Sequence, residues 1–145
     1  MKMIRNTIAV IAGLFVALAI ITFSVMINSY WIPFNYKGLP IEHWRSVVRT
    51  AKVEFFIALL ISSGIASLMG GIVCALIVKT AKKAYAMLIG FILLIAAIAT
   101  IFTFKGYPTW YIVCMFFIFF PFSWLGAQLV EWLQNKKNKK VNLQR

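Results

Sequence analysis

The chain has 145 residues, of which 63% are hydrophobic and 12% charged, with a mean hydropathy of +0.91 and a formal net charge of +12. Soluble globular proteins are roughly 45–50% apolar and about 25% charged, so this composition excludes a water-soluble domain and requires lipid around most of the chain. The positive charge would suit nucleic-acid binding, but nearly all of the basic residues flank apolar segments, where they set membrane topology. We therefore expect the lipid bilayer as the main partner and no nucleic acid.

Four apolar segments are long enough to cross a bilayer, which takes about 20 helical residues. They run over about 8–28, 53–78, 84–104 and 110–133. The first is longer than the apolar core of a signal peptide and lacks a small-residue cleavage site, so we expect it to be retained. The sequence predicts one all-α membrane domain over 1–145, a four-transmembrane-helix bundle with a short amphipathic segment before the second span.

The distribution of basic residues predicts the orientation of this bundle. Ten of them precede the first span, fill the second connection or follow the fourth span, whereas five lie in the first and third connections. Because the more basic side of a membrane protein faces the cytoplasm, we expect both termini in the cytoplasm of a bacterial inner membrane.

The first connection, over about 29–52, is the only long one. Its second half places apolar residues at helical spacing on one face, whereas its basic residues fall largely off that face. This pattern predicts either a separate interfacial helix over 41–52 or the first turns of the second span. The apolar positions are Trp44, Val47, Val48, Ala51 and Phe55.

The segment "EHWR" at 42–45 is the one place where an acid, an imidazole, an aromatic ring and a guanidinium occur together. Glu42 and His43 suit acid–base chemistry, but no nucleophile or oxyanion device is recognisable beside them. We expect a contact to a partner protein or a lipid headgroup, and no catalytic residue. The candidates for this contact are Glu42, His43, Trp44, Arg45 and Glu54.

The second span is built from small side chains, in the stretch "SSGIASLMGGIVCA" at 62–75. On a helical wheel the small residues cover one broad arc and the large ones a narrow stripe opposite. Small residues let helix backbones approach closely in lipid, so the sequence predicts packing inside the bundle; a homodimer seam and a pore lining are the alternatives. The predicted packing residues are Ser63, Ser67, Gly70, Gly71 and Ala75.

Three further features complete the prediction. Pro121 lies in the middle of the fourth span, where a proline kinks a helix. The polar tail over 134–145 is predicted to be disordered and to attract anionic headgroups at the cytoplasmic face. Cys74 and Cys114 lie in apolar runs without other metal-ligating residues nearby, so we expect neither a metal site nor a cofactor.

The C-terminal 40 residues or so carry "PTWY", then an apolar helix with Pro121, Trp124, Leu125 and Gly126 as "P-x-x-W-L-G", then a basic tail. Together with the Gly-Gly of the second span, this resembles small four-helix bacterial inner-membrane proteins of uncharacterised function. The resemblance implies a bacterial origin and no activity.

From these observations we expect a non-enzymatic accessory or interaction protein, with an immunity or exclusion protein as one concrete form. The first alternative is an oligomeric small transporter or channel, which would need Ser63, Ser67 and Glu54 to face a water-filled path. The second alternative is a membrane-embedded enzyme, for which Glu42, His43 and Arg45 are the only polar group available.

Overall fold

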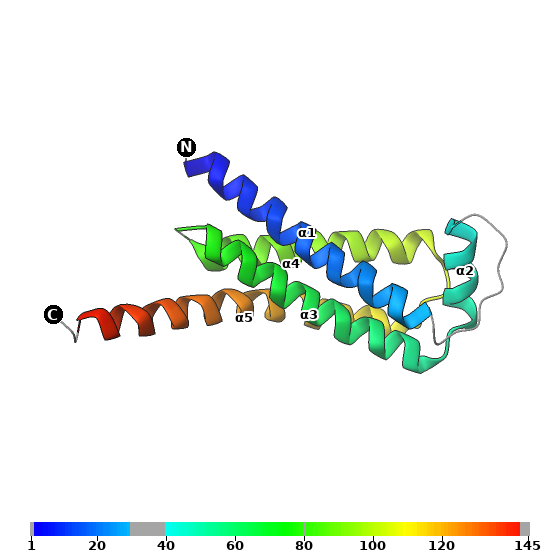
Figure 1. Ribbon diagram of the computed structural model, residues 1–145. Helices are drawn as coiled ribbons and strands as arrows, with labels where there is room; N and C mark the ends of the chain where they lie inside the picture. The colour runs from blue at the N-terminus through cyan, green and yellow to red at the C-terminus, as the bar shows by residue number, and fades with distance from the viewer. Residues whose placement is uncertain (1, 30–39, 80, 143–145) are drawn as a thin grey trace.

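The computed structural model describes residues 2–29, 40–79 and 81–142, and helix is the only regular secondary structure in these residues (Figure 1). The described residues form five helices: α1 (Lys2–Ser29), α2 (Pro40–Thr50), α3 (Val53–Ile77), α4 (Lys82–Thr103) and α5 (Thr109–Asn142). All except α2 are long and apolar enough to cross a membrane. The predicted all-α bundle of four spans is therefore confirmed.

Helix α3 lies at the centre of the bundle and packs against α1, α4 and α5. Helices α4 and α5 also pack against each other, and α1 crosses α3 obliquely (Figure 1). Helix α2 lies across one end of the bundle, which we call the α2 end. The first turn of α1 and the last turns of α5 lie at the opposite end, which we call the terminal end (Figure 1).

Helix α2 shows which of the two predictions for the segment before the second span is correct. It begins at Pro40 and ends at Thr50, and Ala51 and Lys52 separate it from α3. Proline suits the first turn of a helix because its missing N–H has no partner there in any residue. Val47 and Val48 are buried against the bundle, whereas Arg45 and Arg49 are exposed. The amphipathic segment is a separate helix.

The predicted disorder of the tail is wrong over its described part. Helix α5 continues without interruption from the span through Asn142, and 143–145 lie outside the described residues. Extending an existing helix avoids the cost of a new nucleus, and lysine and glutamine are good helix formers. Cationic side chains are also favourable near the C-terminus of a helix.

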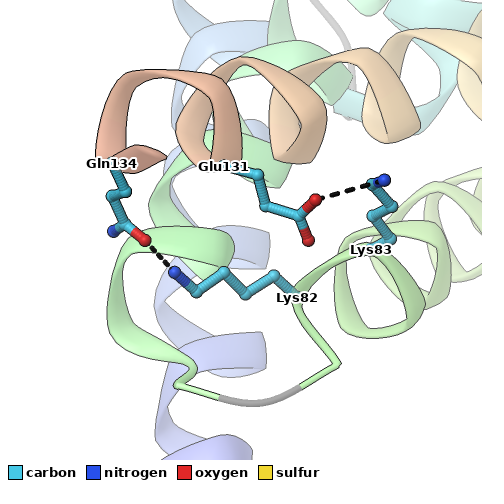
Figure 2. A network of polar contacts seen from close by, with 4 residues as sticks. All are labelled: Lys82, Lys83, Glu131 and Gln134. Atoms are coloured by element: carbon cyan, nitrogen blue, oxygen red, sulfur yellow. Dashed lines mark hydrogen bonds and ion pairs between the residues drawn. The ribbon is translucent and has the colours of Figure 1, made fainter. Parts of the chain in front are cut away.

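Two polar contacts fasten α5 to the start of α4 at the terminal end (Figure 2). Lys83 forms an ion pair with Glu131 at 3.1 Å. Lys82 donates a hydrogen bond to the side-chain oxygen of Gln134. Both contacts lie where α5 leaves the apolar span, so they hold the beginning of its polar extension against the bundle.

Close contact between α1 and α3 depends on glycine in both helices. A Cβ atom on Gly13 would lie 2.7 Å from the carbonyl oxygen of Gly70, and one on Gly70 would lie 2.9 Å from that of Gly13. Ala9 and Ala17 are fully buried one turn to each side of Gly13. Helix α1 therefore has its own series of small residues at every fourth position, which faces α3.

Helices α3 and α5 approach equally closely on the other side of α3. A Cβ atom on Gly71 would lie 2.6 Å from the carbonyl oxygen of Ser123 in α5. One on Gly126 would lie 2.5 Å from that of Leu68 in α3. Of the adjacent glycines, Gly70 contacts α1 and Gly71 contacts α5. Helix α3 therefore lies between α1 and α5.

Candidate functional site

The predicted packing residues of α3 all lie inside the bundle. Ser63 and Ser67 are only 2% and 0% exposed, and Gly70, Gly71 and Ala75 are buried. The Ser67 hydroxyl donates to the carbonyl oxygen of Phe119 in α5 at 2.9 Å. The Ser63 hydroxyl donates to the carbonyl oxygen of Leu59 in its own helix. The serine hydroxyls are used in packing and in bonds to backbone carbonyls.

The residues of "EHWR" are not assembled into one polar site. Glu42 and Arg45 are exposed on α2, whereas Trp44 is half-buried and packs against the core of the bundle. The His43 side chain lies outside the described residues. Glu54 is exposed in the first turn of α3 and forms no ion pair with any described residue. These residues are close together in the sequence, but on the helix Trp44 faces the bundle whereas Glu42 and Arg45 face away from it.

An aromatic cluster lies beneath α2. The Trp44 indole N–H donates to the Tyr107 hydroxyl at 3.2 Å, which ties α2 to the α4–α5 connection. The Tyr107 ring stacks on Tyr111, with ring centroids 5.4 Å apart, and Phe56 meets both rings edge-on. Burial raises the pKa of the Tyr107 hydroxyl, and the hydrogen bond from Trp44 opposes that shift in part. This cluster fixes the position of α2 over the bundle.

An apolar cavity of about 160 Å³ lies between the long helices, in the half of the bundle nearer α2. Four of the polar side chains in its wall are hydrogen-bonded within the protein. Thr100 bonds the Ala96 carbonyl oxygen, Ser63 bonds the Leu59 carbonyl oxygen, and Tyr107 accepts from Trp44. The apolar wall is formed by Leu18, Ile21, Val25, Leu59, Leu93, Ala96, Ala97, Ile101, Met115 and Phe119.

The chemistry that this arrangement offers is the binding of apolar groups. A cavity with mostly apolar walls holds hydrocarbon better than water. Among the described residues no group of three or more His, Cys, Asp or Glu side chains is placed to hold a metal ion. Both cysteines are free thiols.

Sequence reasoning missed both the small-residue series of α1 and the cavity. The spacing of Ala9, Gly13 and Ala17 at i, i+4 and i+8 was a readable signal for the first. No sequence signal marks the cavity, because its wall combines residues from four long helices, α2 and the α4–α5 connection. Sequence reasoning also missed the Asn6 side-chain amide, which donates to the Tyr85 hydroxyl between α1 and α4.

The fold and the site define a four-span α-helical membrane protein with an apolar cavity between its long helices. Comparison of the chain with protein-family models, with curated proteins and with solved structures finds no match. The resemblance to small four-helix bacterial proteins therefore stays a prediction.

Proposed function

We propose that this protein is a non-enzymatic component of a bacterial cytoplasmic membrane, with both termini in the cytoplasm, that acts by binding another membrane protein. A protein of the immunity or exclusion type would work in this way. The observation that carries the proposal is the placement of α2, a charged helix held on the end of the bundle.

Helix α2 has the form of a recognition element. Val47 and Val48 anchor one face, and the Trp44–Tyr107 hydrogen bond fixes its position. Glu42 and Arg45 lie three residues apart in the helix and are both exposed. Side chains at this spacing are neighbours on a helix surface, so α2 presents a pair of opposite charges at the α2 end. Complementary charges on a partner would give specificity.

The charges at the two ends support the proposed orientation. The terminal end carries the basic residues of the α3–α4 connection and of the α5 extension, and Trp132 lies beside them with the Lys136 ammonium 4.9 Å from its ring centre. Basic residues beside a membrane span favour the cytoplasmic side of the membrane. The α2 end would then face away from the cytoplasm.

The packing of α3 weakens the case for a transporter. That alternative needed Ser63, Ser67 and Glu54 along a water-filled path. Both serines are instead buried and bonded to backbone carbonyls, and Glu54 lies at the end of the span. An interaction role does not need such a path.

Co-purification from the native host in mild detergent tests the proposal. We expect the wild-type chain to retain a second membrane protein at a defined stoichiometry. The double variant Glu42→Arg with Arg45→Glu exchanges the exposed charges of α2 and should lose that partner. Lys137→Glu, which changes an exposed charge at the terminal end, is the matched control and should retain it. Recovery of the wild-type chain alone, or as a homo-oligomer, would contradict the proposal.

A further inference from the structure

We propose that the apolar cavity binds one acyl chain of an anionic amphiphile, whose acidic headgroup lies at Arg49 and Lys105. This inference goes beyond the proposed partner-binding role, and the cations that it invokes, Arg49 and Lys105, differ from the exposed pair Glu42 and Arg45. It is carried by the volume and wall of the cavity, by the aromatic residues at one end of it, and by the cations beside them.

The volume and wall of the cavity match part of a hydrocarbon chain. A cavity of about 150 Å³ with aliphatic and aromatic walls stays dry and binds benzene, so 160 Å³ takes about six carbon atoms. It is far too small for a helix of a partner protein, whose diameter is about 10–12 Å. Acyl chains surround every span of a membrane protein and are the apolar groups available in the bilayer.

The aromatic residues at the α2 end of the cavity suit the polar end of a lipid. Trp44 and Tyr107 both contribute to the cavity wall, and their hydrogen bond lies between α2 and the α4–α5 connection. Tryptophan and tyrosine favour the headgroup level of a bilayer because each has an apolar body and a polar tip. A chain in the cavity would therefore have its headgroup near these two residues.

Two cations flank this position. Lys105 is exposed in the α4–α5 connection, two residues before Tyr107. Arg49 extends over the same connection, since a Cβ atom on Gly106 would lie 3.4 Å from its Cγ atom. Gly106 has a φ of +141°, a conformation that favours glycine and keeps this approach open. Neither cation forms an ion pair with a described residue, so both are available to a phosphate or a carboxylate.

Photolabelling in lipid nanodiscs tests the inference. The probe is phosphatidylglycerol with a diazirine in its acyl chain, diluted into phosphatidylcholine, and the labelled residues are mapped by mass spectrometry. Leu93 and Met115 line the cavity and are only 3% and 7% exposed, whereas Phe15 and Phe117 are each 74% exposed. We expect label on both pairs, because a chain in the cavity reaches residues that surrounding lipid does not. Label confined to Phe15 and Phe117 would overturn the inference.

Two variants on α4 provide a matched comparison. Ala97→Phe puts a ring into the cavity and should remove most of the label from Leu93 and Met115. Ala99→Phe adds the same ring at an exposed position outside the cavity wall and should leave that label unchanged. Equal labelling in the two variants would contradict the inference. If Ala97→Phe fails to fold, labelling of Leu93 and Met115 against Phe15 and Phe117 in the wild-type protein still tests the inference.

The headgroup is tested with a matched lipid. Phosphatidylcholine carrying the same photoreactive chain should label Leu93 and Met115 less than phosphatidylglycerol, by up to about thirtyfold for two cations. Arg49→Gln with Lys105→Gln should remove this preference. Equal cavity labelling by both lipids in the wild-type protein would overturn the headgroup assignment. A photoreactive free fatty acid in a parallel sample identifies the source: stronger labelling by it means a free acid, and weaker labelling means a phospholipid.

Discussion

Individual small residues decide how closely the helices of this protein approach one another. Gly71 faces a backbone carbonyl of α5, whereas Gly64, two turns earlier in the same helix, faces the Ile118 side chain. A side chain can rotate away from an added methyl group, but backbone atoms move only if a whole helix moves. The two glycines therefore differ in what a substitution costs.

Gly71→Ala should destabilise the protein, because its Cβ atom would lie 2.6 Å from the Ser123 oxygen. Overpacking of this kind costs about 1–3 kcal/mol. Gly64→Ala is the control, because its Cβ atom would lie 3.1 Å from Ile118 Cγ2 and the substitution also improves helix propensity. Thermal unfolding in detergent, followed by size-exclusion chromatography, measures both. A Gly71→Ala protein as stable as Gly64→Ala would contradict the close contact of α3 and α5.

The buried face of α3 was predictable from the sequence, whereas its partners were not. The segregation of Ser63, Ser67, Gly70 and Gly71 from the large residues is visible in one helix alone. That Gly70 meets α1 while Gly71 meets α5 depends on the crossing of three helices. A pattern with a period of 3.6 residues gives the direction of a face and says nothing about which helix lies opposite.

At the scale of elements, α2 and the extension of α5 lie outside the apolar spans and differ most from expectation. The sequence placed α2 correctly but left open whether it was continuous with α3, because Ala51 and Lys52 carry no turn signal. The α5 extension was predicted to be disordered from its composition. Composition reports the absence of an apolar core, and it neglects the helix already formed in the span, which the extension continues.

Tyr107→Phe should loosen α2 from the bundle. The substitution leaves the half-buried Trp44 N–H without its acceptor and costs about 1 kcal/mol. The substitution should also remove the part of the pH dependence of stability that comes from ionisation of Tyr107. Burial raises the pKa of Tyr107 from 10.0, so its contribution is fully present below pH 10 and is lost as pH rises further, where the unfolded chain ionises first. Thermal unfolding of both proteins at pH 8 and at higher pH measures this. A wild-type protein that loses no more stability than Tyr107→Phe above pH 10 would contradict the assignment.

At the scale of the whole molecule, the polar and the apolar parts of the protein are separated along the bundle. The centre is closed by small residues and serine–carbonyl bonds, and the charged side chains lie at the two ends. The proposed interactions follow this division: a protein partner at the exposed face of α2, an acyl chain in the cavity beneath it, and anionic headgroups at the α5 extension. A conducting path would require the centre to be open.

Cysteine labelling with a membrane-impermeant thiol reagent tests the closed centre most directly. In a background without Cys74 and Cys114, single cysteines replace Ser63 and Ser67 in α3, with Lys105 and Lys79 as exposed references at the α2 end and the terminal end. In intact cells we predict that only the cysteine at 105 reacts, and that the one at 79 reacts after the membrane is opened. Positions 63 and 67 should stay unlabelled in both conditions. Labelling of both serine positions in intact cells would show a water-filled path through α3 and would contradict the closed bundle.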